Sequence, residues 1–352
     1  MTRDVAIVTG ASGWLGGRLV ECLAEGLPDG PELARTGGER PIRALVPAGT
    51  APDLFAHVDG RIQLIVGDLT QPETLVPLFR NAQAATVFHC AGVTHPRRVS
   101  EFYRVNTTGT QNLLAAARKA DVRRIVHVSS SSPIGVGGPP EEAFDEVAPY
   151  NPGSHYGRSK MLAERAVWES ACSGGPPSVV IRPSPYYGPN QPAAQAEFVR
   201  AVRTGHASIV GTGENRRSLA YVDNVCQGLL LAEEVERARG QTYWIADARP
   251  YPITEIVDTV ELVLARDFSI KVAGGRRWLP GWLADLAWLA DRTTQAAGFY
   301  SRTLHEMAEA SRTIACRIRK ATEELGYQPR VDLEEGTRRA VRWMLDHGQS
   351  LG

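Results

Sequence analysis

Short apolar runs alternate with longer amphipathic stretches along the first half of the chain. The runs are rich in β-branched residues, have the length of buried strands, and span 5–8, 42–46, 62–66, 85–88, 124–128 and 178–181. The stretches between them repeat their apolar residues at helical spacing, for example over 15–24, 103–117 and 159–171. Such alternation predicts an α/β fold, in which helices cover both faces of a doubly wound parallel sheet.

The alternation loosens after Pro183, which indicates a second region of different construction. We expect residues 1–182 together with 217–250 to form the sheet domain. Residues 183–216 together with 251–352 are then a smaller mixed C-terminal lobe that binds the substrate. Residues 26–41 are rich in Gly and Pro and are expected to form a surface loop.

The most apolar late segment covers residues 277–289 and carries three tryptophans. We favour an ordinary lobe helix packed by Trp282, Leu286 and Leu289, which follow helical spacing. The alternatives are a lid over an apolar substrate and a helix that lies in a membrane interface. The acidic Asp285 and Asp291, and the lack of a face rich in Lys and Arg, argue against membrane docking.

Charge and cysteine usage narrow the possible partners. Lys plus Arg and Asp plus Glu both number 39, so no net field attracts nucleic acid, and a small-molecule partner is favoured. The five cysteines are scattered singly, and we expect no metal site. No run of 18 apolar residues predicts a membrane span, and the first apolar run leaves no room for a signal peptide. We therefore expect a cytoplasmic protein.

Three glycines, Gly10, Gly13 and Gly16, stand between the first predicted strand and the first predicted helix. Gly10 permits the sharp turn, Gly13 lets a pyrophosphate approach the backbone, and Gly16 lets helix and sheet pack closely. The phosphate would then meet free N–H groups at the positive end of the helix. Tight packing without a ligand is the alternative explanation of this motif.

Tyr156 and Lys160 are four residues apart at the start of a predicted helix, so they share one face. A free tyrosine titrates near pH 10, and lowering its pKa by about three units requires about 4 kcal/mol of preferential phenolate stabilisation. A neighbouring ammonium supplies part of this. The pair therefore predicts an acid/base group, although solvated helix residues at the same spacing are common.

Together these motifs resemble the extended short-chain dehydrogenase/reductases, the NAD-dependent epimerase/dehydratase family. The late motifs at 218–225, 240–247 and 324–329 look like its 3β-hydroxysteroid dehydrogenase-like branch. The resemblance implies a Rossmann-type sheet and catalysis by Ser130, Tyr156 and Lys160. The cofactor contacts it implies are Gly10, Ser12, Gly13, Trp14, Leu15, Gly16, Asp68, Leu69, Ala91, Gly92, Tyr156, Lys160, Pro183 and Ser184.

Several neighbouring residues carry further expectations. Asp68 contacts the adenine by the resemblance, and a helix cap before Leu69 and Thr70 is the alternative. Asn106 matches an asparagine whose role we expect to be structural. Ser131 and Tyr187 are candidate substrate contacts, as is Arg217. No acidic residue ends the second strand, so the choice between NAD and NADP is nearly open, with NAD slightly favoured.

The expected activity is hydride transfer between a nicotinamide and a secondary alcohol or ketone, with Tyr156 as the acid/base. Nucleotide-sugar epimerisation or dehydration is the alternative, because Arg217 falls where such enzymes of the superfamily place an arginine on the substrate diphosphate. A non-catalytic nucleotide sensor is a lesser alternative, since both Tyr156 and Lys160 are present. We also expect a homodimer.

Overall fold

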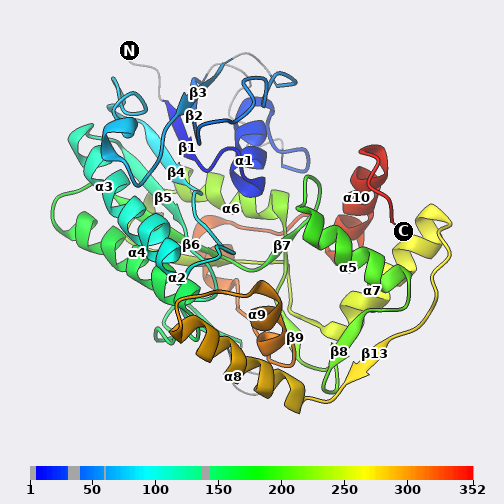
Figure 1. Ribbon diagram of the computed structural model, residues 1–352. Helices are drawn as coiled ribbons and strands as arrows, with labels where there is room; N and C mark the ends of the chain where they lie inside the picture. The colour runs from blue at the N-terminus through cyan, green and yellow to red at the C-terminus, as the bar shows by residue number, and fades with distance from the viewer. Residues whose placement is uncertain (1–4, 31–39, 59–60, 137–142, 352) are drawn as a thin grey trace.

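A seven-stranded parallel sheet forms the centre of the molecule in the computed structural model, which describes residues 5–30, 40–58, 61–136 and 143–351 (Figure 1). The strand order across the sheet is β3-β2-β1-β4-β5-β6-β11. This order reverses direction between β1 and β4, as in a Rossmann-type sheet. The predicted fold class is thus confirmed. The strands are β1 (Ala6–Thr9), β2 (Ile42–Val46), β3 (Ile62–Val66), β4 (Thr86–His89), β5 (Arg124–Val128), β6 (Ser178–Pro183) and β11 (Thr242–Ile245).

Two hydrophobic clusters lie on opposite faces of this sheet because side chains alternate along each strand. Val8 belongs to the cluster beneath α1 (Trp14–Glu25) and α6 (Val222–Glu234). Its neighbour Ile7 belongs to the cluster beneath α3 (Thr110–Lys119) and α4 (His155–Cys172). Both faces are therefore covered, which explains why the strands appear in the sequence as continuous apolar runs.

The helix predicted over 103–117 is present, but its first part is wound differently. A short α2 (Val99–Phe102) leads into the π-helical segment η3 (Tyr103–Gly109), and α3 follows without a break. Within the π-helical turn, the Asn106 side chain hydrogen-bonds both backbone groups of Val93. Such widened turns are rare and are frequently found at functional sites.

Three helices from the second half of the chain pack around a separate cluster of buried aliphatic side chains. They are α5 (Ala193–Arg203), α7 (Ile253–Phe268) and α10 (Leu333–Asp346). Three short strand pairs lie outside the central sheet: β7 (Tyr186–Tyr187) with β10 (Ala220–Tyr221), β9 (Arg216–Arg217) with β12 (Tyr251–Pro252), and β8 (Ser208–Val210) with β13 (Arg277–Leu279). The remaining short turns are η2 (Pro72–Leu75), η4 (Glu236–Ala238) and η5 (Ala321–Leu325).

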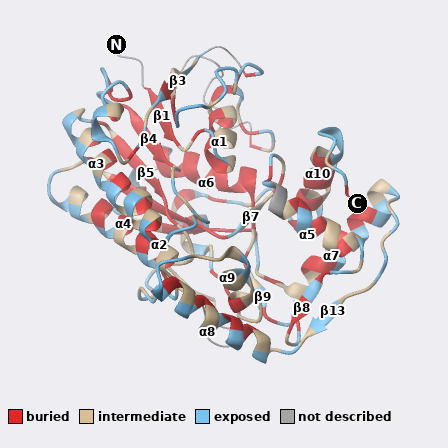
Figure 2. Cartoon of the chain, in the orientation of Figure 1, coloured by how far each residue is buried: buried red, intermediate tan, exposed pale blue. Residues whose placement is uncertain are grey.

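A helical hairpin formed by α8 (Trp282–Ala296) and α9 (Arg302–Glu309) lies below the sheet domain in Figure 1. The expectation that Trp282, Leu286 and Leu289 pack this helix is wrong, since these side chains are 59%, 55% and 57% exposed. The helix packs instead through small and polar side chains, including Asp291 and Gln295 (Figure 2). Among the described residues no helix is long and apolar enough to cross a membrane.

Candidate functional site

The glycine turn after β1 approaches the turn after β4 closely. Gly10 has a φ of 72°, which favours glycine, and a Cβ there would lie 2.7 Å from the Cα of Ala91. A Cβ on Gly16 would lie 2.2 Å from the carbonyl oxygen of Gly10. Both glycines therefore allow close packing of backbone against backbone, as the motif predicts.

Gly13 differs, because within 4 Å a Cβ there would meet, among the residues that the structure describes, just the Gly10 carbonyl oxygen, at 3.2 Å. Gly13 and Ser12 are exposed, and the N-terminus of α1 has neither a side-chain cap nor an acidic residue in its first turn. Open space thus faces uncapped N–H groups at the positive end of a helix. This is an arrangement that fits a phosphate group.

The side chains of Trp14 and Leu15 both pack against other parts of the protein. The Leu15 side chain is buried in the core. The indole of Trp14 donates a hydrogen bond to the Pro189 carbonyl oxygen at 2.6 Å, and its ring lies 4.8 Å from that of Tyr186. This contact ties the start of α1 to the segment where the chain enters the lobe.

At the end of β3 the Asp68 carboxylate is exposed and accepts a hydrogen bond from the Thr70 N–H at 2.8 Å. This bond closes a local turn and does not cap a helix, because the short helix η2 that follows has Gln71 at its N-terminus and no side-chain cap. A carboxylate can accept several hydrogen bonds, so Asp68 keeps capacity for a ligand. Leu69 is buried, and its backbone oxygen accepts from Asn112.

The turn after β4 brings Gly92, Asn106 and Lys160 together. A Cβ on Gly92 would lie 3.2 Å from Asn106 Oδ1 and 4.0 Å from Lys160 Nζ. Asn106 Nδ2 also donates to the Ser159 hydroxyl on α4, at 3.0 Å. Asn106 therefore links the π-helical segment to the helix that carries Tyr156, in agreement with the structural role expected for it.

Tyr156 lies in the first turn of α4, where the Ser154 hydroxyl caps the helix by accepting from the Gly157 N–H. Burial raises the pKa of Tyr156, and a hydrogen bond with Ser130 partly opposes that rise. The phenol ring packs against Phe102, with ring centroids 5.7 Å apart. Ser130 therefore lies beside the phenol, which stays protonated at neutral pH. The lowered pKa that the spacing of Tyr156 and Lys160 predicts is not found, because burial outweighs the stabilisation of the phenolate.

Lys160 is buried one turn further along α4, and its Nζ donates to the Val128 carbonyl oxygen at 2.6 Å. Burial lowers the pKa of Lys160 to about 8, although the charges of Glu164 and Cys90 oppose the shift. Lys160 therefore carries its charge at neutral pH, but its pKa lies close to that pH. Val128 ends β5, so this bond fixes α4 against the strand that leads to Ser130.

A buried ion pair supports this arrangement and was not predicted from the sequence. Glu164 accepts two hydrogen bonds from Arg182 on β6, at 3.0 and 2.7 Å. It also accepts from the Ser129 hydroxyl and from the Tyr150 phenol. The pair joins β5, β6 and α4 behind the candidate catalytic residues. No local pattern reveals it, because the four residues meet only in the fold.

The remaining candidate residues occupy different places. Pro183 and Ser184 are buried where β6 ends, and the Ser184 hydroxyl lies 3.3 Å from the Cys316 sulfur. Ser131 is partly exposed beside Ser130. The Tyr187 phenol donates to Asp247 at 2.9 Å, and the Arg217 guanidinium donates to the Glu309 carbonyl oxygen. The hydroxyl of Tyr187 is thus engaged by Asp247.

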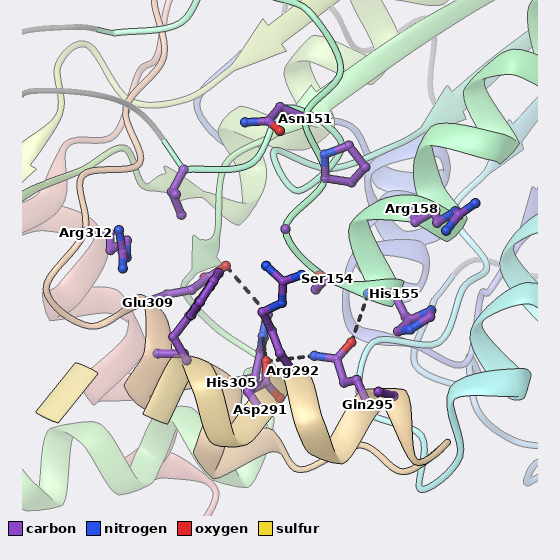
Figure 3. Close-up of a pocket in the computed structure, with 16 residues that line it drawn as sticks. Asn151, Ser154, His155, Arg158, Asp291, Arg292, Gln295, His305, Glu309 and Arg312 are labelled. Atoms are coloured by element: carbon purple, nitrogen blue, oxygen red, sulfur yellow. Dashed lines mark hydrogen bonds and ion pairs between the residues drawn. The ribbon is translucent and has the colours of Figure 1, made fainter. Parts of the chain in front are cut away.

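A cavity of about 530 Å³ lies between the N-terminal turn of α4 and the α8–α9 hairpin (Figure 3). Asp291 accepts from Gln295 at 2.7 Å and contacts His305 at 3.1 Å. Gln295 Oε1 in turn accepts the backbone N–H of His155 at 2.9 Å. Asp291 and Gln295 are buried, so this chain of contacts connects the hairpin directly to the residue that precedes Tyr156.

Comparison with known proteins gives a consistent family assignment. The model of the NAD dependent epimerase/dehydratase family matches residues 6–246. The chain is 42% identical to the uncharacterized protein y4nL of Sinorhizobium fredii over 352 residues, which are 100% of this chain and 98% of that protein. A 4-hydroxy-2-methyl-3-oxo-4-farnesyl-3,4-dihydroquinoline-1-oxide ketoreductase of Stigmatella aurantiaca is 30% identical, with coverage of 94% and 93%.

A mouse relative, the decarboxylating sterol-4-alpha-carboxylate 3-dehydrogenase of Mus musculus, is 26% identical over 87% of each chain. Among solved structures, DesIV of Streptomyces venezuelae superimposes with a TM-score of 0.73 at 24% identity, and 97% of each chain is covered. DesIV is a dTDP-glucose 4,6-dehydratase whose structure holds NAD and TYD. At this identity the likeness supports the fold.

Proposed function

Because this chain belongs to the NAD-dependent epimerase/dehydratase family, we propose that it is a nicotinamide-dependent oxidoreductase that interconverts a ketone and a secondary alcohol. The observation that carries this proposal is the convergence of Ser130, Tyr156 and Lys160 beside the turn at Gly92. The family match and the dehydrogenase and ketoreductase relatives support an enzyme of the extended short-chain dehydrogenase/reductase type.

The residues suit proton transfer to a carbonyl oxygen. Burial raises the pKa of Tyr156, so its phenol carries a proton at neutral pH and can donate it. Ser130 hydrogen-bonds the phenol and can hold the substrate oxygen in line with it. The Lys160 ammonium favours the phenolate that remains after the transfer. In the reverse direction the phenolate accepts the proton of the alcohol.

The glycine turn fits a dinucleotide. Gly13 leaves space in front of the uncapped α1 terminus, where a pyrophosphate would bind, and the exposed Asp68 carboxylate would contact the adenine. When bound, a nicotinamide cofactor supplies or accepts the hydride at the substrate carbon. NAD is the slightly favoured form of the cofactor. The two arginines nearest the second strand already have partners within the protein: Arg40 binds Glu233, and Arg43 donates to the carbonyl oxygens of Leu78 and Arg80.

The substrate class that we favour is an apolar cyclic ketone. Two relatives are named for a farnesylated dihydroquinoline and for a sterol carboxylate, both of which combine rings with a large apolar surface. The alternative is nucleotide-sugar epimerisation or dehydration, in which Arg217 would bind a diphosphate. Arg217 donates to the Glu309 carbonyl oxygen, which engages part of its guanidinium within the lobe. Net oxidoreduction therefore stands as the proposal.

Replacing Tyr156 with Phe tests the proposal. The change removes only the hydroxyl, so we expect turnover of a cyclic ketone to fall by at least a thousandfold while cofactor affinity stays nearly the same. Tyr243→Phe is the matched control, because Tyr243 lies on the edge strand β11 and its phenol hydrogen-bonds Glu324 of η5. If Tyr156→Phe kept activity within tenfold of the wild type, Tyr156 would not be the acid/base.

A further inference from the structure

A buried histidine bridges two threonines close to the turns after β1 and β4. His89 is the last residue of β4 and is 1% exposed. Its Nδ1 lies 2.8 Å from the hydroxyl oxygen of Thr9, which ends β1. Its Nε2 lies 2.9 Å from the hydroxyl oxygen of Thr110, which begins α3. Both ring nitrogens are therefore engaged in a place that solvent does not reach.

The direction of each hydrogen bond follows from the hydrogens that are available. A threonine hydroxyl has one hydrogen to donate, and its oxygen can also accept. The Thr110 hydroxyl donates to the Asn106 carbonyl oxygen at 2.6 Å, so it accepts from His89 Nε2. The Thr9 hydroxyl accepts from the Ala91 N–H at 3.2 Å, which leaves its own hydrogen for His89 Nδ1. These partners select the neutral ring that carries its proton on Nε2.

The surroundings of the ring favour its neutral form as well. Burial lowers the pKa of His89 to about 3, and the positive charge of Lys160 acts in the same direction. An ordinary histidine changes its charge between about pH 5 and 8, and His89 remains uncharged throughout that range. The neutral state and the tautomer of His89 thus have independent causes, one in burial and charge and the other in the two threonines.

The hydrogen bonds continue from His89 to the backbone of the acid/base residue. Asn106, which receives the Thr110 hydrogen on its carbonyl oxygen, donates from its own Nδ2 to the Ser159 hydroxyl at 3.0 Å. The Ser159 hydroxyl donates in turn to the Tyr156 carbonyl oxygen at 2.8 Å. Every donor along this path points from the sheet toward α4. The path therefore ends in the helical turn that carries the phenol.

The other end of the path lies at the glycine turn. Thr9 directly precedes Gly10, and a Cβ on Gly10 would lie 2.7 Å from the Cα of Ala91. The bond from the Ala91 N–H to Thr9 thus holds together the turns after β1 and β4. These are the turns that would hold the cofactor in the function proposed above. His89 stands between them and the helix that presents Tyr156.

We propose that His89, as the neutral tautomer protonated on Nε2, is a positioning residue that fixes Tyr156 relative to the turns after β1 and β4. It acts through the hydrogen bonds on either side of its ring. Its effect on the reaction rests on the proposed function, in which Tyr156 meets a substrate held beside the nicotinamide. A displacement of about 1 Å between reacting groups can lower a rate on the order of a hundredfold.

His127 offers a matched comparison. It is the register partner of His89 on the neighbouring strand β5, and the two rings lie 5.1 Å apart. His127 is also buried, yet neither of its ring nitrogens has a hydrogen-bond partner within residues 5–30, 40–58, 61–136 and 143–351. Leucine at either position removes a buried imidazole, but only at His89 does it break the path to Tyr156.

Nuclear magnetic resonance of the full-length protein with isotope-labelled histidines tests the tautomer. The signals that vanish in His89→Gln belong to His89. We expect them to show a protonated Nε2 and an unprotonated Nδ1, and to stay unchanged between about pH 5 and 8. A proton on Nδ1 in place of Nε2, or a charged ring in this range, would overturn the proposal.

Variants that keep one side of the ring test the positioning. Glutamine can place an N–H donor where Nε2 stands, and asparagine can place an acceptor oxygen where Nδ1 stands. We expect His89→Gln to keep kcat for a cyclic ketone within about threefold of the wild type, because the bond toward Thr110 persists. His89→Asn and His89→Leu should lower kcat at least tenfold with KM nearly unchanged, and His127→Leu should change kcat less than about threefold. Equal kcat in His89→Leu and His127→Leu would contradict the proposal.

Hydrogen exchange of the peptides that cover residues 154–160 separates this proposal from the proposed reaction, because it needs no substrate. Exchange there should rise roughly fivefold in His89→Asn and His89→Leu, and stay at the wild-type rate in His89→Gln and His127→Leu. If the wild type reduces no ketone, the proposed function fails while exchange and tautomer still decide the role of His89. Equal exchange in the wild type and His89→Leu would show that His89 does not position Tyr156.

Discussion

At the scale of single residues, the candidate site depends on contacts that α4 makes with the strands of the central sheet. The glycine turn, Tyr156 and Lys160 are found where the motifs place them, because each depends on a strand or helix that local pattern defines. The bond from Lys160 to Val128 and the contacts of Glu164 join residues that are far apart in the chain. No local pattern encodes such pairs.

Gly13 offers a direct test of the cofactor turn. Gly13→Val fills the open space in front of α1 and approaches only the Gly10 carbonyl oxygen, so we expect the fold to persist while NAD and NADP affinity fall at least tenfold. Calorimetric titration with both nucleotides measures this effect and also establishes the preferred cofactor. Gly153→Val is the control, since a Cβ there meets nothing within 4 Å. Equal affinity in the Gly13 variant and the wild type would remove Gly13 from the site.

Lys160 predicts a pH dependence. Its ammonium supports the phenolate, and burial lowers the pKa of Lys160 to about 8, so ketone reduction should fall as the pH rises through about 8. The contribution of Lys160 to the stability of the fold changes with pH in the opposite direction. In the folded protein the pKa of Lys160 lies below the ordinary lysine value of 10.5, so the penalty for burying the charge is present below about pH 8 and is relieved as the pH rises above it.

Rates measured across this range with Lys160→Arg provide the comparison. An arginine stays charged, so any residual activity of that variant should lack the loss near pH 8. A wild-type rate that stays level to about pH 10 would show that the charge of Lys160 is not required.

At the scale of elements, the strands and long helices follow the predicted pattern, and the departures occur at α8 and at η3. Helix α8 was expected to pack through its large apolar residues, since such residues on a surface helix are usually buried. It packs instead through Asp291 and Gln295, whose partners lie on α9 and α4. The π-helical turn at η3 was also not predicted, because its stabilising contacts come from the loop at Val93.

The contact between Gln295 and α4 yields a prediction at this scale. Gln295→Leu removes the acceptor of the His155 N–H, which is worth about 1 kcal/mol, so exchange of that amide should rise roughly fivefold. Hydrogen exchange of the peptides that cover residues 152–160 measures this change. Thr293→Ala, at an exposed position of the same helix, is the control. Unchanged exchange at His155 would mean that α8 does not restrain the first turn of α4.

At the scale of the whole molecule, the division into a sheet domain and a substrate lobe remains a prediction, as do the homodimer and the cytoplasmic location. Residues near Leu325 and Tyr327, placed in the lobe by the sequence, pack into the cluster beneath α1 and α6. The cavity between α4 and the α8–α9 hairpin is lined by segments of the chain that range from Val136 to Arg312. Segments this far apart meet only in the folded chain, so the sequence could suggest a lobe but could not locate the cavity.

The central claim is that this enzyme carries out net oxidoreduction, and the balance of nicotinamide against product tests it most directly. Purified protein is mixed with reduced NAD or NADP and a panel of apolar cyclic ketones, and both the nicotinamide absorbance and the alcohol product are measured. We expect one nicotinamide to be oxidised for each alcohol formed, and Tyr156→Phe to abolish both changes. Turnover of a nucleoside diphosphate sugar with no net change in nicotinamide, together with no reduction of any ketone, would contradict the account.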